Sequence, residues 1–147
     1  MTASRSPIRR YVLDANALIA FFEGRQPAAE KVRKLLAEAA HDALPLWMSA
    51  VNWGEVYYIE WRRYGESKAR EAEGNLFRLP IVVLSADRDR ATRAAALKQK
   101  HNLGYADAFA AELAIEQRAW LVTADPEFEE LGKALLLYTL PRHQNLP

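Results

Sequence analysis

The stretch "RYVLDANALIAFF" (Arg10–Phe22) changes character half-way along, and this change decides how the chain is expected to fold. Its first part, up to Leu13, consists of residues typical of a buried β-strand. The apolar residues from Leu18 onward predict a helix. Asp14 lies at the junction of the two, where removing a carboxylate from water is costly unless something pairs with it. The sequence therefore raises the question of what Asp14 does there.

The same alternation of strand and helix continues along the chain. Short apolar runs bounded by turn-forming residues predict strands at 8–14, 44–50, 81–85, 119–125 and 134–140. Helical periodicity predicts helices at 15–23, 27–40, 51–64, 67–79, 87–101 and 105–118. Strands that alternate with helices favour a parallel sheet with helices on both faces. We therefore expect an α/β sandwich, formed as one domain by residues 1–147 with its core at about 8–140.

Composition excludes several classes of protein. The chain has 147 residues, with 20 Lys plus Arg against 19 Asp plus Glu, so any positive surface for nucleic acid must be local. It contains no cysteine, which excludes disulfide and thiol chemistry and suits a reducing compartment. Its apolar runs are far shorter than the roughly 20 residues of a membrane-spanning helix. The sequence predicts a cytoplasmic protein with no membrane segment.

Four acids occupy positions that are unusual for surface charges. Asp14 and Asp125 each end a predicted strand, and the carboxyl ends of parallel strands face the crevice where the strand order reverses. Glu55 lies in the middle of a helix among aromatic and aliphatic residues, and Asp107 lies near the start of another helix. Asp14, Asp107 and Asp125 could each simply cap a helix. Four such acids at one sheet edge nevertheless predict a shared site.

Carboxylates gathered in one place repel one another and require a cation or bound protons. Ligands that are all oxygen indicate a hard divalent ion, so we expect one or two Mg²⁺ or Mn²⁺ ions. Zinc is disfavoured because cysteine is absent and His41, His101 and His143 show no ligand spacing. Carboxylate sites for such ions serve phosphoryl transfer or phosphodiester hydrolysis.

Three stretches carry a resemblance to a known family. They are "YVLDANALIAFF" (11–22), "MSAVNWGEVYYIEW" (48–61) and "LGYADAFAAELAIEQRAWLVTADPEFEEL" (103–131). In order and approximate spacing they resemble the four acidic blocks of PIN domains. Among PIN domains, the compact length of the chain and the residue pattern of the blocks are most similar to those of VapC-type toxins of bacterial toxin–antitoxin pairs. The resemblance extends from Ile8 to Leu140.

The resemblance implies a PIN-like three-layer sandwich with a parallel sheet of four to five strands. It implies a Mg²⁺- or Mn²⁺-dependent endoribonuclease that cleaves structured RNA, such as tRNA or rRNA, and leaves 5′-phosphate and 3′-hydroxyl ends. A cognate antitoxin and a homodimer are also implied. The residues that match the family's catalytic and metal-binding acids are Asp14, Glu55, Asp107 and Asp125. Asn16 falls where the family often has Ser or Thr, and Thr123 matches its hydroxyl position, so both are expected to support the site.

Contacts with RNA and with a partner can also be assigned to candidate residues. Phosphate contacts are expected from the local basic clusters Arg9–Arg10, Arg62–Arg63 and Lys98–Lys100–His101, although each could merely complement a helix dipole. Arg62 is preferred because it lies two turns beyond Glu55 on nearly the same helix face. An aromatic stripe, which could instead belong to the core, is expected to form an antitoxin-binding groove from Phe21, Phe22, Trp53, Tyr57 and Trp61.

Other functions must be weighed against this one. A phosphatase of the haloacid dehalogenase type needs a second Asp at the position of Asn16, and a receiver domain needs an acidic pair and a Lys that are not evident. A PIN module without catalysis is disfavoured because all four acid positions are filled. A PIN nuclease that processes RNA without an antitoxin stays open, and an adjacent gene for a small DNA-binding protein would distinguish the two.

Overall fold

The computed structural model describes residues 9–142, which form a five-stranded, fully parallel sheet. The order of the strands across the sheet is β3-β2-β1-β4-β5. Their bounds are β1 Tyr11–Leu13, β2 Leu46–Ser49, β3 Ile81–Leu84, β4 Trp120–Thr123 and β5 Leu136–Thr139.

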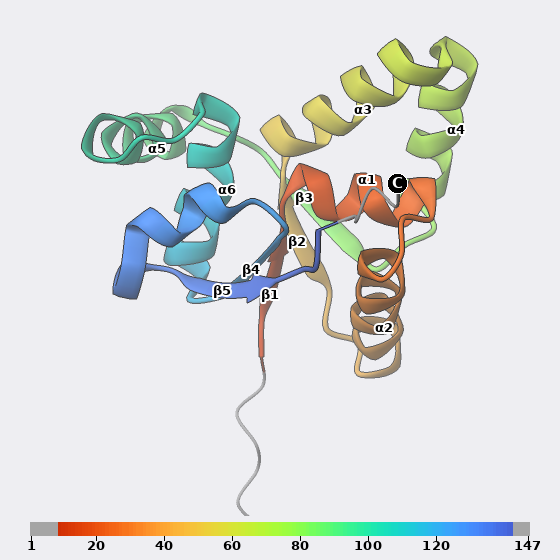
Figure 1. The fold of residues 1–147 in the computed structure, drawn as a ribbon, viewed down its shortest axis with the longest axis horizontal. Coiled ribbons are helices and arrows are strands. Elements are labelled where there is room, and N and C mark those ends of the chain that lie inside the picture. The colour runs from red at the N-terminus through yellow and green to blue at the C-terminus, as the bar shows by residue number, and fades with distance from the viewer. Residues whose placement is uncertain (1–8, 143–147) are drawn as a thin grey trace, which may run out of the picture.

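Helices cover both faces of this sheet, with α5 and α6 on one side and α1 and α2 on the other (Figure 1). The predicted α/β three-layer sandwich is therefore confirmed. The helices are α1 Ala15–Glu23, α2 Ala28–His41, α3 Ala50–Tyr64, α4 Glu66–Leu76, α5 Arg88–Lys100 and α6 Tyr105–Gln117, followed by the 3₁₀-helix η1 Pro126–Ala134.

The strand order reverses between β1 and β4, which are direct neighbours. Val12 pairs with Leu121 and Leu13 pairs with Val122, so the two strands end side by side. Ligand sites of parallel sheets lie beyond the carboxyl ends of the strands at such a reversal. The residues that follow Leu13 and Thr123 in the chain therefore lie close together, at the carboxyl ends of β1 and β4.

Side chains of the central strands alternate between two buried layers. Val12 and Leu121 pack with α6 and η1, whereas Leu13 and Val122 pack with α1 and α2. All four side chains are fully buried. This explains why short strands read as continuous apolar runs, because neither face of a central parallel strand meets water.

The middle of helix α6 is enclosed on every side, and every residue from Ala108 to Ala114 is buried. Its alanines allow it to approach the sheet closely. Its outer side is covered by α5, from which Arg90 and Arg93 form ion pairs with the buried Glu112. The helix that carries Asp107 is therefore held rigidly at the sheet.

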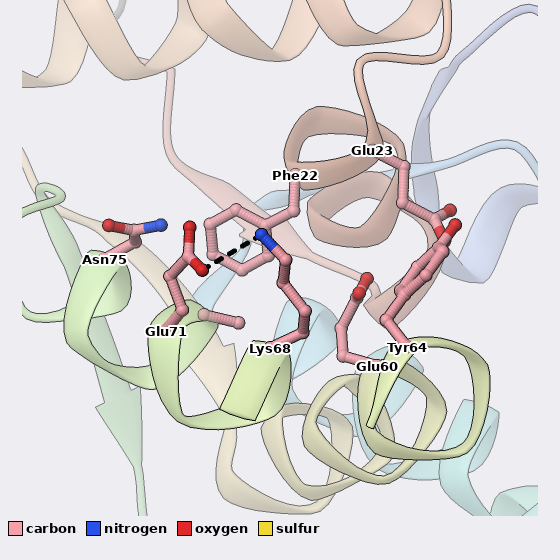
Figure 2. Close-up of a pocket in the computed structure, with 8 residues that line it drawn as sticks. Phe22, Glu23, Glu60, Tyr64, Lys68, Glu71 and Asn75 are labelled. Carbon is pink, nitrogen blue, oxygen red and sulfur yellow. Dashed lines mark hydrogen bonds and ion pairs between the residues drawn. The ribbon is translucent and has the colours of Figure 1, made fainter. Parts of the chain in front are cut away.

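Helices α3 and α4 form a hairpin that extends beyond the sheet and packs against α1 (Figure 1). The chain turns between them at Gly65, whose φ of 94° is a conformation that residues with a Cβ rarely adopt. A pocket of about 300 Å³ lies between the end of α1 and this hairpin (Figure 2).

The structure differs from the sequence prediction mainly at the ends of elements. The first predicted strand starts at Ile8, which lies outside the described residues. Helix α4 ends at Leu76 rather than at residue 79, because Pro80 disfavours helical backbone in the residue before it. The prediction missed η1, and β5 consequently starts at Leu136 rather than at residue 134. None of the helices described in residues 9–142 is both long and apolar enough to cross a membrane.

Candidate metal centre

Thr123, the last residue of β4, links the ends of the two central strands. Its hydroxyl donates a hydrogen bond to Oδ2 of Asp14 at 2.9 Å. The same oxygen accepts hydrogen bonds from Nδ2 of Asn16 at 3.1 Å and from the backbone N–H of Asp125 at 3.0 Å. The one proton and both lone pairs of this hydroxyl are therefore used, and Thr123 is only 1% exposed.

Asn16 completes the link from the first turn of α1. Its Oδ1 accepts a hydrogen bond from the backbone N–H of Ala124 at 3.1 Å. Asp14, at the N-terminus of the same helix, accepts a hydrogen bond from the N–H of Ala15 at 2.8 Å. Asn16 and Thr123 thus contact each other and hold the loop after β4 against the start of α1.

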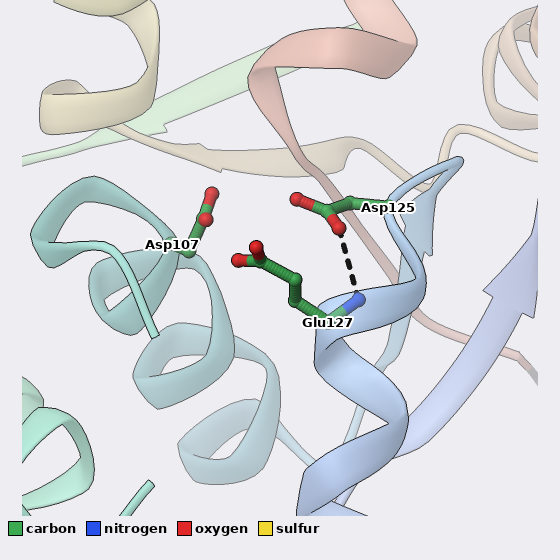
Figure 3. Close-up of side chains that lie close together, drawn as sticks. All are labelled: Asp107, Asp125 and Glu127. Carbon is green, nitrogen blue, oxygen red and sulfur yellow. Dashed lines mark hydrogen bonds between the residues drawn. The ribbon is translucent and has the colours of Figure 1, made fainter. Parts of the chain in front are cut away.

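Three further carboxylates lie close together beside this link (Figure 3). Asp107 comes from the first turn of α6, and Asp125 and Glu127 come from the start of η1. Each offers a carboxylate oxygen within 4.8 Å of the other two. Oδ1 of Asp125 also accepts a hydrogen bond from the N–H of Glu127 at 2.9 Å, which caps η1.

The sequence prediction did not include Glu127. The available signal was its spacing, because an acid two residues after Asp125 lies in the first turn of the helix that Asp125 caps. Glu127 is exposed, unlike Asp14, which is only 2% exposed. Asp14 and Glu55 do not belong to this group of three acids, whose carboxylate oxygens lie within 4.8 Å of one another.

The charges of all five acids, Asp14, Glu55, Asp107, Asp125 and Glu127, nevertheless interact with one another. Burial, reinforced by the negative charge of Asp107, raises the pKa of Asp14 to about 7. Burial, together with the charges of Asp125, Glu55 and Glu127, raises the pKa of Asp107 to about 6. Burial also raises the pKa of Glu55. These carboxylates interact through space even where no single ion contacts all of them in the present side-chain positions.

Glu55 is connected to the other acids through Asn52, which lies one helical turn before it on α3. Nδ2 of Asn52 donates a hydrogen bond at 3.0 Å to the carbonyl of Ala106, the residue next to Asp107. Asn52 is completely buried. This bond fixes the helix that carries Glu55 against the helix that carries Asp107.

The donor set fits a hard divalent cation. Ligand oxygens of an octahedral Mg²⁺ lie about 3 to 4 Å from one another, because each is about 2.1 Å from the ion. The carboxylate oxygens of Asp107, Asp125 and Glu127 already lie within 4.8 Å of one another, and small side-chain rotations would bring them to that spacing. Within residues 9–142, no Lys, Arg or His forms an ion pair with any of the five acids. A metal ion would supply the missing positive charge.

The basic candidates for RNA contacts occupy different surroundings. Arg9 and Arg10 stack over Trp120 and Trp47 before β1 begins, so they lie at the opposite end of the strands from Asp14. This pair does not contribute to the acid-lined edge. Nη1 of Arg63 forms an ion pair with Glu23 at 3.0 Å.

The other basic candidates stay predictions. Nη1 of Arg62 donates to the Tyr58 hydroxyl at 2.7 Å, and the side chain is exposed. Nζ of Lys98 donates to the carbonyl of Leu103 at 3.0 Å, whereas Lys100 is exposed.

The aromatic stripe is continuous along α3. The ring centroids of Trp53 and Tyr57 lie 6.3 Å apart, and those of Tyr57 and Trp61 lie 5.9 Å apart. Trp53, Phe21 and Phe22 are partly buried and pack against the core between α1 and α3, and their role in antitoxin binding stays a prediction. Trp61 is 45% exposed and is the member of the stripe that is most available to a partner.

Comparisons with known proteins identify relatives of this fold. The sequence profile described as "PIN domain" matches residues 11–134. A search of curated proteins found no significant sequence match.

Solved structures of similar fold include VapBC complexes and a VapC toxin. DNA-bound VapBC from Salmonella typhimurium has a TM-score of 0.70 at 17% identity, covering 90% of this chain and 98% of that chain. VapBC2 from Rickettsia felis, bound to a promoter DNA fragment, has a TM-score of 0.69 at 17% identity, covering 88% and 97%. VapC20 from Mycobacterium tuberculosis, a toxin that cleaves the sarcin–ricin loop, has a TM-score of 0.63 at 15% identity, covering 76% and 86%. At such identities the likeness shows the fold.

The raised pKa of Asp14 predicts a pH-dependent stability for the metal-free protein. Folded Asp14 keeps its proton up to a pKa of about 7, whereas the unfolded residue loses it near the ordinary aspartate pKa of 3.8. The folded state therefore binds more protons across this window, and Asp14 alone should lower the free energy of unfolding by about 2–3 kcal/mol from pH 5 to pH 8, to which Asp107 adds a smaller contribution. Urea unfolding with a chelator at both pH values measures this change. Asp14→Asn should remove most of it, and an unchanged pH dependence in this variant would contradict the assignment.

The position of Gly104 predicts a second effect. A Cβ at this residue would lie 3.2 Å from Oδ2 of Asp107, although the backbone conformation itself suits alanine. Gly104→Ala should displace the Asp107 carboxylate and weaken Mn²⁺ binding on the order of ten-fold, measured by calorimetry. Gly74→Ala is the control, because a Cβ there has no neighbour within 4 Å. It should leave Mn²⁺ binding unchanged and stabilise α4 by about 0.5–1 kcal/mol. Equal Mn²⁺ affinity of the two variants would refute the effect.

Proposed function

The chain belongs to the PIN domain family, and from this premise we propose that it is a metal-dependent endoribonuclease. The observation that carries the proposal is the group of acids around the β1–β4 reversal, which has no ion-pairing basic residue within residues 9–142. We further propose that the enzyme is the VapC-type toxin of a toxin–antitoxin pair. Its substrate is a structured RNA, such as tRNA or rRNA, and its products carry 5′-phosphate and 3′-hydroxyl ends.

The residues that would hold Mg²⁺ or Mn²⁺, directly or through water, are Asp14, Glu55, Asp107 and Asp125, and Glu127 lies within reach of the last two. Asp14, Glu55 and Asp107 are expected to matter most. When bound, the ion would lower the pKa of a coordinated water and stabilise the leaving oxygen. Thr123 fixes one oxygen of Asp14 and the N–H of Ala15 fixes the other, so this carboxylate is oriented before any ligand arrives. The first turn of α6 favours the negative charge of Asp107 through the helix dipole.

The proposal of a toxin has separate support. Two of the similar solved structures are VapBC complexes bound to DNA, and the third is a toxin that cleaves the sarcin–ricin loop. On these grounds we propose a cognate antitoxin and an RNA substrate for this chain, and from its PIN domain we further propose a homodimer. Trp61 is the proposed anchor for the antitoxin, because it is exposed at the end of the aromatic stripe and on the same helix as Glu55.

Substitution of the acids tests the proposed catalysis. Asp14→Asn and Asp107→Asn should each reduce Mg²⁺-dependent RNA cleavage by at least about 100-fold, because several kcal/mol of transition-state stabilisation depend on the metal. Glu55→Gln should behave similarly, and substitutions of Asp125 and Glu127 should cost less. Glu129→Gln is the matched control, since Glu129 lies in the first turn of η1 but outside the cluster. Mapping new 5′ ends in total RNA measures cleavage and target together, and a fully active Asp107→Asn enzyme would refute the mechanism.

The antitoxin is tested through Trp61. Trp61→Ala should weaken binding of the small protein encoded beside this chain by roughly 2 kcal/mol, as buried aromatic anchors do, while the free enzyme still cleaves RNA. Leu136→Ala is the control, because Leu136 is equally exposed at 45% but lies on the edge strand β5. Equal loss of antitoxin affinity in both variants would remove Trp61 as the anchor. The lack of any binding partner encoded nearby would favour an RNA-processing nuclease instead.

A further inference from the structure

A buried acid outside the proposed metal centre has no partner. Glu60, on α3, is 5% exposed, and its Oε1 makes no hydrogen bond within the described part of the chain. Glu60 lines the pocket between the end of α1 and the α3–α4 hairpin, and its carboxylate points toward Glu23 and Tyr64 (Figure 2). A buried carboxylate oxygen without a donor is unfavourable by more than an ordinary hydrogen bond stabilises. The pocket therefore contains a carboxylate oxygen, Oε1 of Glu60, that lacks a hydrogen-bond donor.

The cations around this pocket are already engaged. Nζ of Lys68 forms an ion pair with Glu71 at 3.1 Å. Arg25 and Arg63 form ion pairs with Glu23 at 2.7 and 3.0 Å.

The Tyr64 hydroxyl also donates to Glu23, at 2.7 Å. Glu23 is therefore saturated with donors, whereas Glu60 is not. Burial and the negative charge of Glu23 raise the pKa of Glu60, despite the opposing effects of Arg63 and Arg25.

We propose that this pocket binds the arginine side chain of a protein partner, whose guanidinium donates a hydrogen bond to Oε1 of Glu60. A single free carboxylate oxygen does not suit a divalent ion, which needs several ligands. A guanidinium offers five donors and stacks on aromatic rings, and the pocket supplies the rings of Phe22 and Tyr64. A volume of about 300 Å³ is at the small end for ligand sites and suits one side chain.

A peptide is the favoured source of this arginine. Tyr64 is 53% exposed, and Trp61, on the preceding turn of α3, is 45% exposed. These rings offer apolar contact area beside the pocket that a free amino acid would leave uncovered. The site does not involve Asp107, Asp125 or Glu127, so its occupation is independent of RNA cleavage.

Titration followed by ¹H–¹⁵N NMR tests the site in the full chain. The probe is N-acetyl-L-arginine methylamide, and its neutral counterpart of the same shape is N-acetyl-L-citrulline methylamide. The arginine probe should produce saturable shifts confined to the end of α1, the end of α3 and α4. The citrulline probe should bind about ten-fold more weakly or worse, because it lacks the charge that strengthens a hydrogen bond to a carboxylate.

Two variants assign the binding to Glu60. Glu60→Gln keeps the shape of the side chain and should weaken binding of the arginine probe by about ten-fold. Glu66→Gln is the control and should change affinity less than about two-fold, because the Glu66 side chain is 45% exposed, paired with Arg70 and not part of the pocket lining. In the wild-type protein, the ¹³C resonance of the Glu60 carboxylate should move as the probe binds, which does not depend on how any variant folds.

Three results would overturn the proposal. They are the lack of a saturable shift, equal affinity for the citrulline probe, and an unchanged Glu60 carboxylate resonance at saturation. Tighter binding of free L-arginine than of the blocked probe would overturn the assignment to a protein partner. RNA cleavage in Glu60→Gln should equal that of the wild type, so a failure of this proposal and a failure of the proposed nuclease are distinguishable.

Discussion

The hydrogen bonds of the Thr123 hydroxyl are the constraint on which the acid-lined edge depends. This single buried group holds the Asp14 carboxylate, the Asn16 amide and the backbone of Asp125 at once. Because β1 and β4 end side by side, the hydroxyl can reach all three. Substitution by a residue without a hydroxyl would leave Oδ2 of the buried Asp14 and the partly buried N–H of Asp125 without this partner, and each loss would cost about 1–3 kcal/mol. The geometry of Asp14 is therefore a property of the fold itself.

The acids at this edge oppose folding, and the rest of the molecule offsets their repulsion. The layers that do so are the two apolar clusters on either side of β1 and β4. Helix α6, which is buried from Ala108 to Ala114, contributes most directly, since its small residues bring Asp107 close to the sheet. Asn52 then fixes α3 to the same helix. A stable scaffold with a destabilised centre is the arrangement that pre-organised catalytic sites commonly show.

The sequence was sufficient to predict this layout because its strongest signals are local. Asp14 follows an apolar run directly, and the alternation of elements predicts that strand ends converge. The features that were missed have tertiary causes. Glu127 becomes a neighbour of Asp107 only when η1 packs beside α6, and the pairing of Arg63 with Glu23 joins residues far apart in the chain. The position of Arg9 and Arg10 could have been predicted, since they precede the strand whose far end carries Asp14.

The short helix η1 carries two of the clustered acids, and its Phe128 and Leu131 belong to the apolar cluster beneath α6. Ion occupancy and the ordering of the C-terminal part of the chain are consequently linked equilibria. A divalent ion held by Asp107 and η1 would act as a cross-link between α6 and the segment that leads to β5. By mass action, its free concentration would add to the stability of that segment, because a ligand that binds only the folded state shifts the folding equilibrium. The free concentration of such an ion would then affect the stability of the edge strand as well as the occupancy of the acid-lined edge.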